Sequence, residues 1–215
     1  MTNVRTKRML AYGVGLNDAD YPVTRHEVVD GKHQIVWKCP IYTTWRSMLT
    51  RCYSPGYQAS KPTYVGCSVA LEWHLFSAFR AWVITKDWHG KQLDKDLLQP
   101  GNKHYSPETC CFVGGTVNSF ITDNAASRGA YPLGVSWHKK TGKVQARCGN
   151  PHSGQDDYLG VFDCPNKAHL AWATRKLKHA VVLAAQQTDQ RIAAALIAMF
   201  ETRHAAARVS LTINT

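Results

Sequence analysis

The sequence predicts an α+β protein with two small domains and a tail at each end. Two observations indicate this class: apolar side chains recur at helical spacing in some segments, and apolar and basic side chains alternate in another. A chain of 215 residues is long enough to form two such cores. We divide it into an N-terminal arm or weak hairpin over 1–40, a central domain over 41–127, a sheet domain over 128–185 and a helical tail over 186–215.

The composition is that of an ordinary globular protein, with 44% hydrophobic and 19% charged residues. No stretch approaches the roughly 20 apolar residues that are needed to cross a bilayer. The N-terminal run MTNVRTKRML carries charge without an apolar segment behind it, so we expect no secretory signal and no membrane anchor. A soluble, cytoplasmic protein is the expectation.

The charge points to a polyanionic partner. The net charge is +11 and the pI is about 9.4. More than half of the excess lies in 128–185, where nine Lys and Arg face three Asp and Glu, a net charge of +6. Nucleic acid is the commonest polyanion in a cytoplasm, so the sheet domain is the expected binding region.

The seven cysteines have irregular spacing and include no Cys-x-x-Cys pair. We expect most of them to be small buried hydrophobes rather than metal ligands. The alternative is a zinc site drawn from Cys39, Cys52, Cys67 and Cys110.

The central domain is predicted to contain two amphipathic helices. The first begins at Pro40 in PIYTTWRSMLTRCY, and its apolar stripe comprises Ile41, Trp45, Met48, Leu49 and Cys52. The run SPGYQASKP then reads as a loop, and YVGCSV as a short extended piece. The second helix ends near Lys86, and its stripe comprises Trp73, Phe76, Phe79 and Val83. We expect these aromatic side chains to form core rather than platforms for bases.

The sheet domain is predicted from an alternating pattern. In GKVQARC, the polar side chains Lys143, Gln145 and Arg147 alternate with Val144, Ala146 and Cys148, so one face is wet and basic and the other is packed. LGVSWHKK precedes this strand across a turn at Thr141-Gly142, and YLGVF follows it after the loop NPHSGQDD. A three-stranded antiparallel meander is the economical fold.

A helix that begins near Pro165 is expected to cover the packed face of this sheet. Its predicted stripe comprises Ala168, Trp172, Leu177 and Val181. The Ala-rich tail, roughly 186–209, is predicted to be a C-terminal helix that continues this helix or packs beside it. It could also pair two copies of the chain in a homodimer.

The wet face is the first candidate site. It presents a grid of donors, comprising Ser136, His138, Lys143, Gln145 and Arg147, with Lys139 and Lys140 at the adjoining turn. In a major groove, Arg and Lys pair with guanine, Gln reads adenine, and flanking Lys groups neutralise phosphates. The pattern favours double-stranded DNA binding over the alternative of a merely solvated basic face.

The second candidate site lies in residues 91–118. Asp94, Asp96, Asn102, His104 and Asn118 could supply ligands to one Mg²⁺ and a general base for water. The spacing alone is not specific, because runs such as DKD and GNK are common in solvated loops.

The run LDKDLLQPGNKHYSPETCCFV, followed by Asn118, resembles the HNH (ββα-metal) endonuclease-like proteins of bacteriophages, many of which are homing endonucleases. The resemblance implies an HNH-like ββα module over 41–127 that cuts or nicks DNA, with Mg²⁺ held by Asp94 or Asp96 and Asn118. The family places a general-base histidine beside an aspartate, where this sequence reads DKD. His104 is then the histidine that could activate water, with Asp94 and Asp96 also in the catalytic set.

The run GVSWHKKTGKVQARC, continued by YLGVFDCPNKAHLAWATRKLK, resembles the AP-two domain of plant ethylene-response factors, which phage HNH proteins often carry at their C-terminal end. The matching positions are Gly134-Val135, Gly142-Lys143, Ala146, Leu159-Gly160 and Phe162. The resemblance implies a three-stranded sheet packed on a helix, and readout of the major groove by Ser136, His138, Lys140, Lys143, Gln145 and Arg147. Val144 stands where the family commonly has tryptophan.

These patterns predict sequence-directed DNA binding, with HNH-type phosphodiester cleavage by the central domain as the activity that the resemblance adds. The alternative is a non-catalytic regulator that uses the same contacts to block or recruit host or phage machinery. An RNA-binding or structural role is a third alternative, because a basic sheet with exposed aromatic rings also suits single strands. If a phage encodes the protein, it would work in the host cytoplasm.

Overall fold

The computed structural model describes residues 10–122 and 130–213, and the chain divides into two compact units, Met1–Gly114 and Gly115–Thr215. Helices and several small sheets occur together, so the α+β class is confirmed. The predicted boundary between 127 and 128 lies outside the described residues. Helix α4 (Gly115–Ile121) belongs to the second unit, where the ring of Phe120 lies 4.8 Å from that of Phe200.

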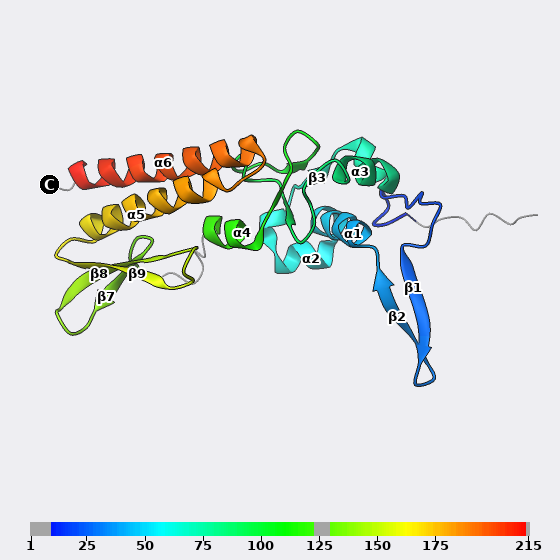
Figure 1. Cartoon of the computed structure of the whole chain (residues 1–215), viewed down its shortest axis with the longest axis horizontal. Helices are drawn as coiled ribbons and strands as arrows, with labels where there is room; N and C mark the ends of the chain where they lie inside the picture. The colour runs from blue at the N-terminus through cyan, green and yellow to red at the C-terminus, as the bar shows by residue number, and fades with distance from the viewer. Residues whose placement is uncertain (1–9, 123–129, 214–215) are drawn as a thin grey trace, which may run out of the picture. The chain divides into compact units, whose positions relative to one another are not determined.

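The first unit contains an antiparallel hairpin of β1 (Thr24–Val29) and β2 (Lys32–Lys38), drawn in blue in Figure 1. The turn uses Asp30 and Gly31, both with positive φ, which is the geometry that a two-residue hairpin turn requires. Almost every side chain of the hairpin is exposed. Of the two alternatives, an arm or a hairpin, the structure therefore shows a hairpin over 24–38.

Helix α1 (Pro40–Tyr53) begins and is buried as its sequence pattern predicts. Its buried residues are Ile41, Trp45, Met48, Leu49 and Cys52. The indole nitrogen of Trp45 donates to the backbone oxygen of Trp73 at 2.7 Å, which fixes α1 against the 3-10 turn η2 (Leu71–His74).

The prediction of a loop after α1 is wrong in part, because this run contains helix α2 (Pro55–Ser60) and the 3-10 turn η1 (Pro62–Tyr64). The Ser54 hydroxyl accepts a hydrogen bond from the backbone NH of Tyr57, and Pro55 occupies the first turn. The Gln58 side chain donates to the carbonyl oxygen of Cys52 at 2.7 Å. Local capping thus forms a turn of helix that apolar periodicity does not reveal.

The second predicted helix is divided in the structure. Trp73 lies on η2, and α3 (Phe76–Val83) begins only after Leu75, whose backbone is extended. Trp73, Phe76, Phe79 and Val83 are all almost completely buried, so their assignment to the core is confirmed. Extended backbone at Leu75 is what interrupts the single helix that the spacing predicts.

Two pairs of short strands complete this unit. Strand β3 (Ser68–Val69) pairs in parallel with β5 (His104–Tyr105), and β4 (Gln92–Asp94) pairs antiparallel with β6 (Cys111–Val113). In the second candidate site, Asp94 lies at the end of β4 and His104 at the start of β5.

The second unit contains the predicted meander. Strands β7 (Val135–His138), β8 (Lys143–Gly149) and β9 (Asp156–Phe162) form one antiparallel sheet in that order. Helix α5 (Pro165–Ala185) contacts all three strands and covers one face of the sheet (Figure 1). Ala168 of α5 packs in one buried cluster with Val144 and Ala146 of β8.

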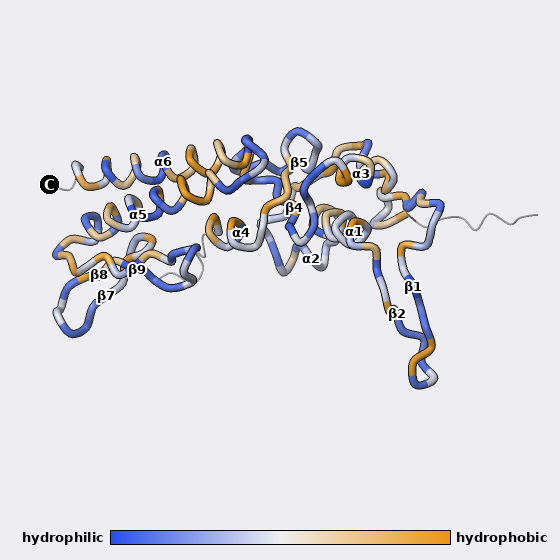
Figure 2. Tube along the Cα trace, viewed as in Figure 1, coloured by the Kyte–Doolittle hydropathy of each residue, from blue (hydrophilic) through white to orange (hydrophobic). Residues whose placement is uncertain are grey.

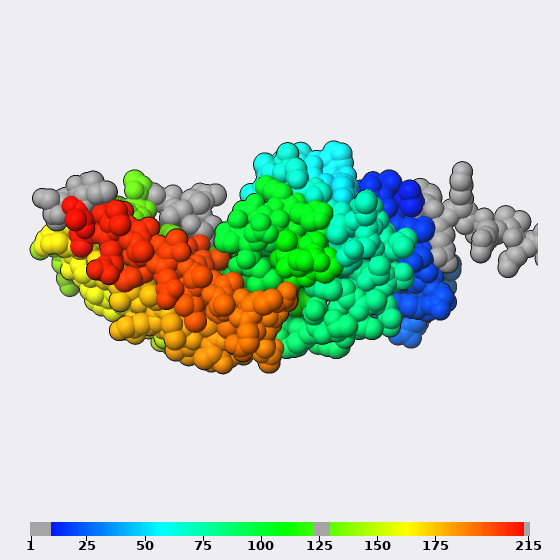
Figure 3. Space-filling model, turned by 90° about the horizontal axis from the view of Figure 1, so that it is seen from above, coloured from blue at the N-terminus to red at the C-terminus, as the bar shows by residue number. Residues whose placement is uncertain are grey.

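Helix α6 (Gln190–Ile213) packs along α5, and the two form adjoining bands in Figure 3, yellow to orange for α5 and orange to red for α6. The C-terminal helix predicted beside α5 is therefore present. The predicted stripe of α5 is only half right: Ala168 and Trp172 are buried, whereas Val181 is 49% exposed and Leu177 is only partly buried. Helix α5 packs against both the sheet and α6, so buried residues lie on more than one side of the helix. They also include Ala173, His179, Ala180, Leu183 and Ala184.

Candidate nucleic-acid interface

The alternation along β8 sorts its side chains onto two faces. Val144, Ala146 and Cys148 are buried, with at most 4% of their surface exposed. Lys143 and Arg147 are exposed between them, and Gln145 is half-buried. Successive side chains of a strand point to opposite faces of the sheet. The strand thus has one apolar face against α5 and one basic face toward solvent, as the sequence predicts.

The register between β7 and β8 brings four predicted residues together. Ser136 lies opposite Gln145, and His138 lies opposite Lys143. The side-chain amide of Gln145 donates to the Ser136 hydroxyl at 3.2 Å. Residues directly opposite each other share a face, with Cβ atoms about 5 Å apart. We call the surface formed by these four residues with Arg147 the basic face.

Strand β9 adds an aromatic residue that the sequence analysis did not assign to the site. Tyr158 lies opposite Arg147, and the guanidinium carbon lies 5.6 Å from the centre of the tyrosine ring. The Tyr158 side chain is 55% exposed. A register shift between Ala146 and Arg147 determines this pairing. The sequence shows a tyrosine at the start of YLGVF, but the residue that faces this tyrosine depends on the strand register.

The turn between β7 and β8 carries Lys139 and Lys140, both exposed, in a segment that Figure 2 colours as hydrophilic. His138 Nδ1 is hydrogen-bonded to the Thr141 hydroxyl at 2.8 Å, which fixes the start of this turn. The two lysines therefore extend the basic face beyond the end of the strands.

One acid moderates the charge of the basic face. The Lys143 ammonium lies 2.7 Å from the carboxylate of Asp163, and both side chains are at least 49% exposed. The hydrogen bond and the charge of Lys143 hold the pKa of the Asp163 carboxyl below its usual value. An exposed pair of this kind is weak, so a phosphate can compete for Lys143.

Gly134 permits the close packing of the sheet on α5. Its φ is +73°, and a Cβ atom added there would lie 1.9 Å from Cδ1 of Trp172. Only glycine combines this backbone with this contact. Trp172 is buried at the same site.

A polar network ties the loop between β8 and β9 to α5. The Asp157 carboxylate accepts hydrogen bonds from His179 Nε2 at 2.8 Å and from the Asn150 amide at 3.2 Å, and Arg175 lies 3.5 Å away. The hydrogen bonds from His179 and Asn150 lower the pKa of Asp157. This network holds the end of the sheet in place.

In the second candidate site, the carboxylate of Asp94 is hydrogen-bonded to its own chain. Oδ1 of Asp94 accepts hydrogen bonds from the backbone NH groups of Asp96 and Leu97, at 2.9 and 2.7 Å. This carboxylate therefore caps a turn.

The other carboxylate is engaged by a lysine. The Lys95 ammonium, on a side chain only 7% exposed, lies 2.6 Å from Asp96 Oδ1 and 2.6 Å from the carbonyl oxygen of Asn102. A buried ammonium already supplies positive charge beside Asp96. The Asn102 side chain in turn donates to the backbone oxygens of Lys95 and His104, so it fixes the local chain.

His104 is exposed, and its Nδ1 is hydrogen-bonded to the Ser68 hydroxyl at 2.9 Å, across the β3–β5 pair. In the tautomer with the proton on Nδ1, the ring donates to Ser68 and Nε2 can accept a proton from water. Ser68 is the orienting partner that the sequence analysis missed, since 36 residues separate the pair.

The predicted ligand Asn118 lies on α4 in the second unit, whereas Asp94, Asp96 and His104 lie in the first. Within residues 10–122 and 130–213, no group of three or more His, Cys, Asp or Glu side chains could hold a metal ion.

The cysteines of the alternative zinc site are all buried. Burial raises the pKa of the Cys52 and Cys110 thiols to about 12. All four cysteines belong to the buried apolar cluster that forms the core of the first unit. Their packing is that of small apolar side chains.

Comparisons with protein-family models, with curated proteins and with solved structures found no match. In the part of the chain that the structure describes, no helix has the length and apolar character needed to span a bilayer.

Proposed function

We propose that this protein binds double-stranded DNA through the basic face of the β7–β8–β9 sheet. The observation that carries the proposal is the register, which aligns Ser136, His138, Lys143, Gln145 and Arg147 on one face while the opposite face is packed on α5. The major groove admits a two-stranded ribbon, and the paired strands β7 and β8 carry all five of these residues.

Each residue of the basic face has a role in this proposal. Arg147 and Lys143 pair with guanine edges, and Gln145 with adenine. Lys139 and Lys140 neutralise phosphates and position the sheet, while Ser136 and His138 supply further hydrogen bonds. Tyr158 orients the Arg147 guanidinium.

The test is binding of fluorescent duplexes, first selected from a random pool, over a series of salt concentrations. Arg147→Ala and Lys143→Ala are expected to weaken binding and to reduce the slope of log K against log salt, because each removes a positive charge from the surface that faces the DNA. Lys178→Ala is the matched control, because Lys178 is exposed on α5, which covers the other face of the sheet. Wild-type affinity and slope in both basic-face variants would contradict the assigned surface.

The proposal includes the relationship to phage HNH proteins with a C-terminal AP-two-type domain. The chain order supports it: the antiparallel strands β4 and β6 lie in the first unit, and α4, a three-stranded antiparallel sheet and its covering helix follow in the second unit. On this proposal, the protein works in the cytoplasm of a phage-infected host cell.

A second candidate function is metal-dependent nicking or cutting of the bound DNA. The hydrogen bond between His104 and Ser68 favours it, because it orients an exposed imidazole. The contacts of Asp94 and Asp96 favour binding without cleavage, since a turn and a buried lysine already engage these carboxylates.

One gel separates the two functions. Purified protein is incubated with supercoiled plasmid in Mg²⁺, Mn²⁺ or EDTA, and both conversion and retardation are recorded. Metal-dependent nicking that is lost in His104→Ala and Asp94→Ala supports an endonuclease. Salt-sensitive retardation without a cut strand supports the non-catalytic regulator.

A homodimer through the C-terminal helix is part of the proposal. α6 buries Ile192, Leu196, Phe200 and Ala207, whereas Val209 is 58% exposed and available to a second copy. Light scattering on the full chain and on Val209→Glu measures this association.

A further inference from the structure

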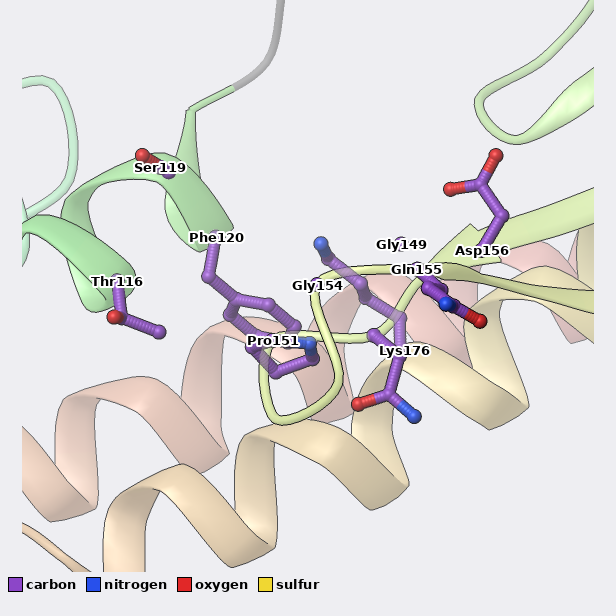
Figure 4. A pocket seen from close by; sticks show the side chains of 10 residues that line it. Thr116, Ser119, Phe120, Gly149, Pro151, Gly154, Gln155, Asp156 and Lys176 are labelled. Carbon is purple, nitrogen blue, oxygen red and sulfur yellow. The ribbon is translucent and has the colours of Figure 1, made fainter.

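A cleft of about 240 Å³ lies in the second unit, where the sheet meets the loop between β8 and β9 (Figure 4). Its walls come from α4, this loop and α5. Phe120 and Pro151 make the wall apolar, Thr116 contributes a hydroxyl, and Lys176 contributes a positive charge.

The Lys176 ammonium is held in an unusual setting. Its nitrogen lies 3.7 Å from the centre of the Phe120 ring and 5.8 Å from that of Phe200. Within the described residues, the ammonium has neither an ion pair nor a hydrogen-bond acceptor. Burial lowers its pKa, and the nearby charge of Arg203 acts in the same direction. An ammonium has three donors, so acceptor oxygens must come from outside the protein.

The cleft adjoins the basic face. Gly149 and Asp156, which both line the cleft, lie opposite each other at the ends of β8 and β9. They are two residues beyond Arg147 and Tyr158 on the same strands, a distance of about 7 Å at the usual rise of a strand. A nucleic-acid strand that follows the basic face toward this end of the sheet would therefore reach the cleft.

We propose that this cleft is a phosphate-binding subsite, in which Lys176 donates to a backbone phosphate of the DNA held on the basic face. The inference rests on the proposed function. Phosphate oxygens supply the acceptors that the ammonium lacks, and the ring of Phe120 holds the ammonium in position before binding. Lys176 is the one cation among the described residues that line the cleft, so the subsite takes a phosphate only when the rest of the strand is anchored elsewhere.

The test measures the affinity of the full chain for the selected duplex against salt concentration. Lys176→Gln is expected to lower the magnitude of the salt slope by about 0.9 and to weaken binding by a similar factor on every sequence. Lys176→Arg keeps the charge and is expected to keep the slope. Lys178→Gln removes an exposed lysine of the same helix and is the control, with the wild-type slope expected.

Lys176→Met is a second neutral variant for use if Lys176→Gln fails to fold, because the apolar methionine side chain can pack against the Phe120 ring. A wild-type slope in the folded neutral variants, with a reduced slope in Lys143→Ala, would overturn the subsite while leaving the proposed function in place. A wild-type protein that binds no duplex would overturn both.

A thermal-shift series with inorganic phosphate at matched ionic strength distinguishes the source of the phosphate. No stabilisation of the wild type is expected. Stabilisation that disappears in Lys176→Gln would assign the cleft to free phosphate and would overturn the role in DNA binding.

Discussion

The Arg147 guanidinium carbon lies 5.6 Å from the centre of the Tyr158 ring, across the paired strands β8 and β9. Both side chains are exposed on the basic face. A guanidinium that lies over an aromatic ring can still use the N–H donors at its edge. Because the ring already restricts the arginine side chain, less conformational entropy is lost when the guanidinium binds a ligand. The contact therefore orders the Arg147 side chain on the surface of the sheet.

Tyr158→Leu is expected to weaken duplex binding about two- to fivefold, because an exposed cation–π contact is worth about 0.5–1 kcal/mol. The salt slope should stay at the wild-type value, since tyrosine carries no charge. Tyr158→Phe retains the ring and should bind as the wild type does. Equal losses in the Leu and Phe variants would show that the ring face is not what matters.

Gly134→Ala is expected to destabilise the second unit by about 3 kcal/mol, from backbone strain at positive φ together with the clash against Trp172. Urea unfolding followed by tryptophan fluorescence measures the change. Gly142→Ala is the matched control: its φ is +65°, but nothing lies within 4 Å of the added Cβ. Equal losses at the two positions would assign the whole effect to backbone strain.

Lys95→Met is expected to lower the stability of the first unit by about 1–3 kcal/mol, because it leaves the Asn102 carbonyl and the Asp96 carboxylate without their donor. Lys91→Met is the control, since it breaks an exposed i,i+4 pair with Asp87 that is worth well under about 1 kcal/mol. Urea midpoints of the two variants are compared. A midpoint for Lys95→Met no lower than that of Lys91→Met would show that Lys95 has no structural role.

Asp157→Asn is expected to lower the melting temperature at neutral pH and to have little effect in acid. His179 and Asn150 lower the pKa of Asp157 in the folded state. The contribution of Asp157 to the free energy of unfolding is therefore fully present above the unfolded pKa of about 3.9. It is lost as the pH falls through the folded value. Melting temperatures of the wild type and of Asp157→Asn, measured from neutral pH into acid, check this pH dependence. Asp156→Asn, which changes the exposed neighbouring carboxylate, is the control. A difference from wild type that persists in strong acid would exclude this linkage.

Elements whose burial follows one local period were predicted correctly. In α1, Trp45 and Leu49 recur at helical spacing and face one core; in β8, Val144 and Ala146 alternate with the polar residues. Each pattern is read directly from neighbouring residues. The position of the basic face therefore needed no tertiary information.

Elements with two packing partners, or with capped short turns, were not predicted. Val181 is exposed because α5 packs on α6 as well as on the sheet, and one helical stripe cannot describe two contacts. Helix α2 depends on the cap at Ser54 rather than on an apolar period.

By itself the sequence determined the α+β class, the meander and the face of β8 that is basic, because these depend on periodicity and charge along the chain. Only the tertiary structure decided which residues from distant segments meet: Arg147 with Tyr158, His104 with Ser68, and Lys176 with Phe120. The physical reason is that strand register and helix packing bring together side chains that are distant in sequence. A local sequence pattern does not show which of these side chains will be in contact.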